Sequence, residues 1–172
     1  MAHTPLKQPI DIEQMPGNLL RRCQQIAVAL FLDECNAYDL TPLQFAVLST
    51  LASRGAQDQV TLGGATALDR TTITVVVRKL EERGLLGRDK SARDQRSKIV
   101  SITAAGLELV QAVLPAVGVV QQRILAPLSE AESAQFLALL AKLADANNSY
   151  SRAPIKRQKG QPTALRAVPV KP

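Results

Sequence analysis

Histidine and cysteine are scarce in this sequence, which holds one histidine and two cysteines among 172 residues. His3 lies in a polar leader, so a zinc site would have to use carboxylates and thiolates with poor spacing. Cys23 and Cys35 lie 12 positions apart in one predicted helix. That spacing is about 18 Å along the helix axis, beyond the reach of a disulfide. We therefore expect no metal site and two reduced thiols.

The residue sets that enzymes need are also absent from the sequence. It has no Ser/His/Asp set, no glycine-rich phosphate loop and no group of four metal ligands. No apolar run approaches the roughly 18 to 20 residues that span a bilayer, and the polar leader has no apolar core that could serve as a secretion signal. We therefore expect a cytoplasmic protein that is not an enzyme and has no catalytic residue, no cofactor and no membrane partner.

Positive charge is in excess, and its placement is more informative than its size. The net charge of +6 divides into −2 over residues 1–59, +4 over 60–104, −2 over 105–151 and +6 over 152–172. A positive middle between two acidic parts is the distribution expected if only the middle meets phosphate.

Apolar residues at three- and four-residue steps predict a mainly helical chain. Thr41 and Gln44 form a capping box, and Asp69 can cap a later helix. Gly63 and Gly64 weaken the short helix that lies between these two helices. Helices are predicted over residues 17–38, 42–53, 61–68 and 70–83.

A hairpin and two long helices follow. The charged stretch 89–97 joins two short strand candidates. Thr103 and Ser129 cap the long helices, and Pro115 and Gly118 should bend or loosen the first of them. Strands are predicted over 85–88 and 98–102, and helices over 104–127 and 130–147.

The middle of this order is typical of a winged helix-turn-helix, within a mainly α protein that has a small β-hairpin wing. Such a unit places its second helix, here 70–83, in the major groove of DNA. Opposite its apolar stripe this helix carries hydroxyls, then cations, which suit base edges and phosphates, and a valine that suits a thymine methyl group. The candidate DNA-binding residues are Thr71, Thr72, Thr74, Val75, Arg78 and Lys79. The alternative is an ordinary solvated helix face.

The hairpin tip favours the DNA-binding interpretation. Asp94 would hold Arg96 extended through a charge-assisted pair, and an extended arginine fits a narrow minor groove. Arg93 adds a further cation to the tip. The alternative is a generic charged turn.

The run DRTTITVVVRKLEERGLLGRDKSARDQRSKIVSIT resembles the signature of MarR-family transcriptional regulators. The resemblance extends through LLRRCQQIAVALF and LTPLQFAVLSTL and covers roughly residues 16 to 148. It implies a homodimer whose first and last helices interlock and which binds a near-palindromic operator. It also implies that Asp94 and Arg96 occupy the wing positions where the family has a structured aspartate and a minor-groove arginine. Gly63-Gly64 departs from the family, which suggests a softer support helix.

Together these arguments divide the chain into four parts. The basic tail has no acid and is predicted to be disordered; it either strengthens nonspecific DNA association or is only a solubilising end. The expected parts are a flexible N-terminal arm (1–16), a helical dimerisation region (17–40 and 103–150), a DNA-binding lobe (41–102) and the tail (151–172).

The resemblance also implies a small-molecule effector, often an aromatic carboxylate, in a cleft between the dimerisation helices and the DNA-binding lobe. Arg21 and Arg22 would supply cations beside an apolar wall that includes Phe45. Gln24 stands where relatives often have a histidine, so a histidine-assisted contact does not carry over. The alternative for the two arginines is a salt bridge.

Two other interpretations stay open. Some family members react through a cysteine in the first helix, and Arg21 and Arg22 could lower the pKa of the Cys23 thiol, although a buried inert cysteine is commoner. The second interpretation is a winged helix that binds only protein, which would leave the basic wing unexplained.

Overall fold

The computed structural model describes residues 11–90 and 98–155, to which every structural statement below refers. Three 3-10 turns, Ile12–Gln14, Asn36–Tyr38 and Asn148–Tyr150, accompany the longer elements. In chain order, the longer elements are α1 (Pro16–Glu34), α2 (Pro42–Arg54), β1 (Gln57–Asp58), α3 (Gln59–Thr66), α4 (Arg70–Glu82), β2 (Leu86–Lys90), β3 (Lys98–Ile102), α5 (Ala104–Leu125) and α6 (Glu130–Ala146). The fold is therefore mainly helical with one small sheet, as predicted.

Side-chain caps fix where α2, α4, α5 and α6 begin, and each of these caps was predicted. The helix α1 begins without a side-chain cap, and α3 is capped by Asp58 and begins at Gln59, two residues before its predicted start. Thr41 accepts a hydrogen bond from the Gln44 backbone N–H, and the Gln44 side chain accepts one from the Thr41 N–H, at 2.9 Å. Ser129 and Glu132 make the same reciprocal pair at the start of α6. Each pair satisfies backbone donors that a helix start leaves open. The predicted capping boxes are confirmed.

The sheet is antiparallel, in the order β1-β3-β2. Leu86 pairs with Ile102 and Lys90 with Lys98, which gives the predicted hairpin. The first hairpin strand begins one residue later than predicted and extends to Lys90. The strand β1 was not predicted, because two residues are too few to show an alternating pattern.

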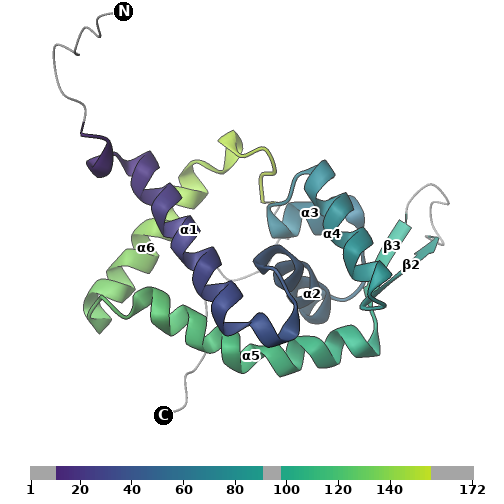
Figure 1. Ribbon diagram of the computed structural model, residues 1–172. Coiled ribbons are helices and arrows are strands. Elements are labelled where there is room, and N and C mark those ends of the chain that lie inside the picture. Colours follow the sequence, from purple (N-terminus) through teal and green to yellow (C-terminus); the bar gives the residue numbers. More distant parts are fainter. Residues whose placement is uncertain (1–10, 91–97, 156–172) are drawn as a thin grey trace, which may run out of the picture.

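The core lies where α2, α4, β3 and α5 meet. Figure 1 shows α1 and α6 on one side and α3, α4 and the hairpin on the other, with α2 between them and α5 running along the bottom from α6 to the hairpin. The fully buried side chains include Leu48, Leu51, Leu80, Val77, Val100 and Val113. Because α2 and α5 share this core with α4, the position of α4 is tied to the long helices.

Gly63 allows a close approach between α3 and the segment that leads into α4. A Cβ atom at this position would lie 3.0 Å from the carbonyl oxygen of Leu68, which is tight, and 3.5 Å from Cγ2 of Ile73 in α4, which is an ordinary contact. The absence of a side chain therefore leaves room for the Leu68 backbone. The softer support helix expected from Gly63 and Gly64 stays a prediction.

The helix α5 runs without interruption through Pro115. Among the described residues it is a helix long and apolar enough, by length and composition, to cross a membrane. No apolar run of this length was predicted from the sequence, and Pro115 and Gly118 were expected to bend or loosen this helix. Much of the apolar surface of α5 is exposed in the single chain, including Leu107, Leu114 and Val119.

Candidate nucleic-acid interface

The helix α4 is held firmly at its start by Asp69. The Asp69 carboxylate accepts a hydrogen bond from the backbone N–H of Thr72 at 2.8 Å. The pKa of Asp69 is lowered, first by this N–H and then by the Thr72 hydroxyl. A carboxylate at this end also interacts favourably with the helix dipole. The predicted cap is confirmed.

One face of α4 is buried and the other is open to solvent. Ile73, Val76, Val77 and Leu80 form the buried stripe, as the spacing predicted. Among the candidate DNA-binding residues, the exposed ones are Thr71, Thr74, Val75, Arg78 and Lys79. Thr72 is only half-buried and lies close to its cap, Asp69. Five of the six candidates thus share one exposed face.

Arg78 is available for a new partner although it forms an ion pair. Its Nε lies 3.8 Å from Oε1 of Glu82, and both side chains are 63% exposed. Exposed pairs of this kind contribute at most about 1 kcal/mol and are screened by salt. A DNA phosphate could therefore replace Glu82 at little cost.

Gln59 is a further residue of the candidate interface, because it contacts Thr74. Its amide Nε2 donates to the Thr74 hydroxyl at 2.7 Å, and the same hydroxyl donates to the Arg70 carbonyl at 2.7 Å. Gln59 lies in α3, 15 positions from Thr74, so no local pattern pointed to it. The contact orients Thr74 on the exposed face.

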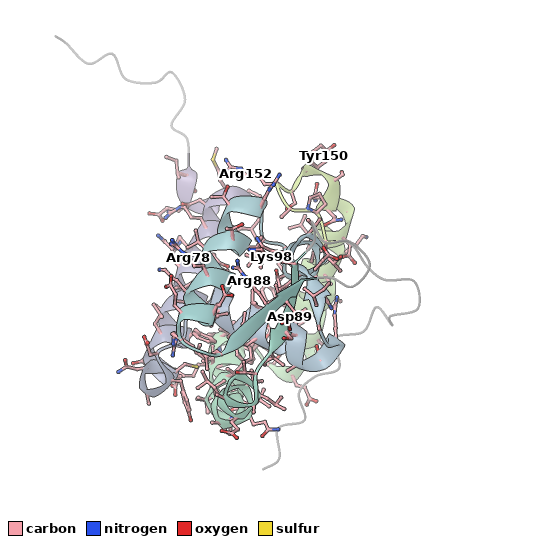
Figure 2. All side chains as sticks on the ribbon, turned by 90° about the vertical axis from the view of Figure 1, so that its right-hand side faces the viewer. Arg78, Arg88, Asp89, Lys98, Tyr150 and Arg152 are labelled. Atoms are coloured by element: carbon pink, nitrogen blue, oxygen red, sulfur yellow. The ribbon has the colours of Figure 1, made fainter. Side chains whose placement is uncertain are left out.

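The base of the wing is attached to α4 by an ion pair. Arg88 in β2 places its Nε 3.2 Å from a carboxylate oxygen of Glu81, with the Arg88 side chain 18% exposed. This N–H is not aligned for a hydrogen bond, so the contact is an ion pair without one. Lys98, at the start of β3, and Arg78 are exposed, and both lie on the side of the molecule shown in Figure 2, as does the less accessible Arg88. The pair therefore fixes the direction in which the hairpin leaves α4.

The three wing residues that the sequence singled out lie beyond this base. Arg93, Asp94 and Arg96 fall outside the described residues. Their contacts with DNA stay a prediction.

The far end of α4 is bonded to the junction between α1 and α2. Arg83 donates to the carbonyl oxygens of Asp39, at 2.5 Å, and Tyr38, at 3.4 Å. Its guanidinium also lies 3.6 Å from the Asp39 carboxylate. Asp39 has a left-handed backbone with φ of 48°. This arginine, which the sequence analysis left unassigned, links the end of α4 to the first helix of the chain.

Among the three candidate effector residues, Arg21 and Arg22 lie apart from Phe45. Arg21 is exposed and donates to Gln25 and Asn18 of its own helix, at 3.0 and 2.8 Å. Arg22 is also exposed. The half-buried Phe45 packs against Phe31, with ring centroids 5.8 Å apart. Phe31 lies ten residues beyond Arg21, or about 15 Å along α1, so one described chain does not bring Arg21 and Phe45 side by side.

The two cysteines have opposite surroundings. Both are free; Cys23 is exposed on α1, whereas Cys35 is fully buried. Burial, and secondarily the charge of Glu34, raises the pKa of the Cys35 thiol. Cys23 is therefore the accessible thiol, although its place on the apolar stripe suggested burial.

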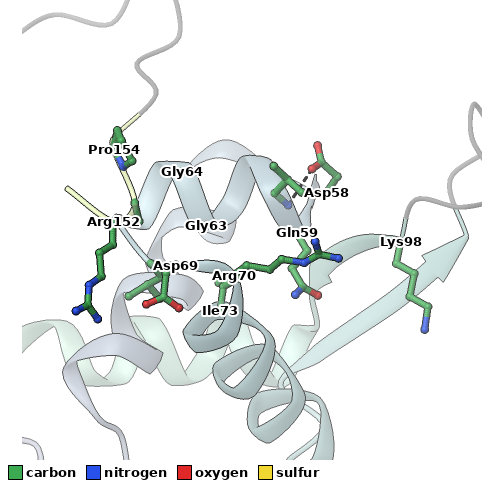
Figure 3. Close-up of a pocket in the computed structure, with 13 residues that line it drawn as sticks. Asp58, Gln59, Gly63, Gly64, Asp69, Arg70, Ile73, Lys98, Arg152 and Pro154 are labelled. Atoms are coloured by element: carbon green, nitrogen blue, oxygen red, sulfur yellow. Dashed lines mark hydrogen bonds between the residues drawn. The ribbon is translucent and has the colours of Figure 1, made fainter. Parts of the chain in front are cut away.

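The described residues also line an open cavity of about 720 Å³ at the surface beside the start of α4. It is bounded by α3, the first turn of α4 and the chain after α6, as Figure 3 shows. Arg21, Arg22 and Phe45 are not among its lining residues. The proposed effector site and this cavity are thus separate places.

Comparisons with known proteins agree on one family. A model described as the MarR family matches residues 40–98, which span α2 to the start of β3. The transcriptional repressor NicR of Pseudomonas putida is 31% identical over 141 residues, which cover 82% of this chain and 89% of NicR.

Two solved structures resemble the whole described fold. BpsR of Bordetella bronchiseptica, whose DNA binding is regulated by 6-hydroxynicotinic acid, has a TM-score of 0.76 and 33% identity, covering 80% of this chain and 99% of BpsR. The repressor CouR, bound to a 23-mer DNA duplex, has a TM-score of 0.73 and 27% identity, covering 82% of this chain and 99% of CouR.

Proposed function

Because this chain belongs to the MarR family of transcriptional regulators, we propose that it is a cytoplasmic repressor that binds a pseudo-palindromic operator as a homodimer and releases it when a small aromatic acid binds. The observation that carries the proposal is the exposed face of α4 beside the wing. This face combines hydroxyls at the start of the helix with cations near its end, within the part of the chain that carries +4. Hydroxyls can read base edges, and cations neutralise phosphates.

The wing supplies the sharpest test of DNA binding. Arg96 is the residue for which we infer an insertion into the minor groove, where a narrow groove attracts a cation. Arg96→Ala should weaken binding to an operator selected from a random duplex pool by at least about fivefold, because a specific contact is worth about 1–3 kcal/mol. Lys142→Ala, which removes an exposed cation from α6, is the matched control. Unaltered binding of the Arg96 variant, measured by fluorescence anisotropy, would contradict the wing assignment.

Exposed apolar side chains on the long helices support the dimer. They lie on α1, α5 and α6, and α6 buries none of its residues in the single chain. A soluble protein rarely leaves so much apolar surface open, so a second copy is the natural cover. The exposed apolar residues of α6 are Phe136, Leu137, Leu139, Leu140 and Leu143. Leu140→Glu should shift the mass seen by light scattering from two chains to one; an unchanged dimer would contradict this role of α6.

For the effector, we propose an aromatic carboxylate held by Arg21 or Arg22. BpsR, which responds to 6-hydroxynicotinic acid, supports this class of ligand. Arg21 donates to neutral side chains of its own helix, and no salt bridge joins it to an acid within residues 11–90 and 98–155. Since Arg21 and Phe45 are separated in one chain, the partner subunit of the dimer would complete the cleft.

A thermal-shift screen of aromatic acids and their coenzyme A thioesters tests the effector directly. A hit should raise the melting temperature and release bound operator, and Arg21→Ala or Arg22→Ala should abolish both effects. Lys142→Ala again serves as the control. A hit that acts on both arginine variants as strongly as on the wild type would contradict the proposed site.

Thiol sensing is a second candidate, favoured by the exposure of Cys23. A peroxide would oxidise this thiol to a sulfenic acid and be reduced to water, without reaching the buried Cys35.

A further inference from the structure

The hydroxyl of Thr74, on the exposed face of α4, already donates its only proton. It donates to the Arg70 carbonyl oxygen at 2.7 Å and accepts from Nε2 of Gln59, also at 2.7 Å. A hydroxyl has one proton to donate and two lone pairs that can accept. Toward solvent, Thr74 therefore offers one lone pair and no proton.

Thr71, on the same face of α4, keeps both abilities. It is exposed, and its hydroxyl has no hydrogen-bond partner within residues 11–90 and 98–155. A free hydroxyl rotates either to donate or to accept, so it suits any base edge. The two threonines look alike in the sequence, but only Thr74 has its hydrogen-bonding character fixed by the fold.

Gln59, which fixes Thr74, is itself well placed. It is the first residue of α3 and follows Asp58, whose carboxylate caps that helix by accepting from two backbone N–H groups. Asp58 also pairs with Ile99 in the sheet. Gln59 is half-buried, and with Arg70 it lines the cavity beside the start of α4 (Figure 3). The amide that donates to Thr74 thus comes from a position that both the sheet and α3 define.

The four bases differ in what they present to such an acceptor in the major groove. Adenine and cytosine each present an exocyclic amino group, which donates, whereas guanine and thymine present carbonyl oxygens, which accept. The free lone pair of Thr74 can accept from an amino group. Opposite a carbonyl oxygen, two acceptors would face each other without a proton between them. Leaving a desolvated acceptor unsatisfied costs more than one neutral hydrogen bond gains.

We propose that Thr74, held by Gln59 and by the Arg70 carbonyl, is a specificity-determining residue that selects adenine or cytosine over guanine or thymine at one position of each operator half-site. Gln59 acts through Thr74 and is a positioning residue. The proposal rests on the proposed function, since it needs the exposed face of α4 to lie in the major groove. It adds to that function a preference for one kind of base edge.

The first experiment compares the operators that variants select from a random duplex pool. Thr74→Val keeps the shape of the side chain without the hydroxyl, and should lose the preference for adenine or cytosine at one position. Thr74→Ser keeps the hydroxyl and should keep the preference. Gln59→Ala should admit guanine and thymine at that position, because a hydroxyl released from Gln59 can turn to donate. Thr71→Val is the matched control: it removes an exposed hydroxyl from the same face and should leave the preference at this position unchanged.

The second experiment tests the amino group itself. In one half-site, the selected adenine or cytosine is replaced by purine or 2-pyrimidinone, which lack only that group. By fluorescence anisotropy the wild type should bind about 2- to 12-fold more weakly, the worth of one neutral hydrogen bond. Guanine or thymine there should weaken binding by at least about fivefold, as expected for an unsatisfied acceptor. Thr74→Val should bind operator and analogue equally, which also controls for effects on the duplex.

The outcomes separate this proposal from the function on which it rests. A selected operator in which no position changes its base preference with Thr74→Val would overturn the proposal, as would guanine or thymine at the position that changes. An unaltered preference in Gln59→Ala would overturn the positioning role of Gln59. If the full chain selects no operator at all, the proposed function fails instead.

Discussion

Replacing Gly106 by alanine should destabilise the protein, although alanine is the better helix former. A Cβ atom at this position in α5 would lie 2.3 Å from the Leu85 carbonyl oxygen and 2.8 Å from Cγ1 of Ile102. The Leu85 oxygen belongs to the backbone and also accepts a hydrogen bond from the Thr103 N–H, at 3.1 Å. A backbone oxygen cannot move aside by a change of rotamer. The start of α5 must therefore shift away from Leu85, which lies just before β2.

The magnitude follows from two opposing terms. Overpacking a buried site costs about 1–3 kcal/mol, and this overlap with backbone belongs at the upper end. The gain in helix propensity from Gly to Ala returns about 1 kcal/mol. The net loss is about 2 kcal/mol, which lowers the melting temperature of a chain of this size by about 4–8 °C.

Gly118→Ala in the same helix is the matched control. No atom lies within 4 Å of the Cβ that it would carry, so the propensity gain should raise the melting temperature by about 2–4 °C. Both variants are melted at one protein concentration and followed by circular dichroism, since a dimer melts at a concentration-dependent temperature. If Gly106→Ala is as stable as Gly118→Ala, the close approach of α5 to Leu85 is not real.

Two further predictions concern titration and thiol access. The pKa of Asp58 is lowered, first by the Thr61 hydroxyl and then by backbone N–H groups, with burial opposing them. Because its folded pKa is below the unfolded one, Asp58 stabilises the fold above about pH 4 and loses this contribution as the pH falls further. Asp58→Asn should therefore flatten the acid side of a plot of melting temperature against pH, and an unchanged acid side would contradict the hydrogen bonding seen at α3. In the folded protein a disulfide reagent should modify Cys23 quickly and Cys35 only on unfolding, so Cys23→Ser, but not Cys35→Ser, removes the fast reaction. If peroxide releases operator equally from wild type and Cys23→Ser, the thiol switch is excluded.

The sequence by itself determined the local structure and the class of the protein. Each capped helix start, such as Thr41 with Gln44, depends on residues within four positions of one another, which a sequence displays directly. The buried stripe of α4 and the span of β3 follow from periods of 3.6 and two residues. The family could be identified from the order of these local signals.

Tertiary structure alone decided which distant residues meet. Gln59 reaches Thr74, and Arg83 reaches the Asp39 carbonyl 44 positions away. Gly63 and Gly106 look like weak points in a helix until the neighbouring backbone shows that each one allows a close approach. Period and propensity describe one segment at a time, whereas these roles depend on which segments the packed core brings together.

The basic tail illustrates the same division. Its charge and lack of acids are evident in the sequence. The loop that precedes it is closed by two hydrogen bonds between the Asn148 side chain and the Ile155 backbone. A hydrogen bond between a side chain and a backbone group seven positions away follows no regular period, so only the folded chain shows this loop.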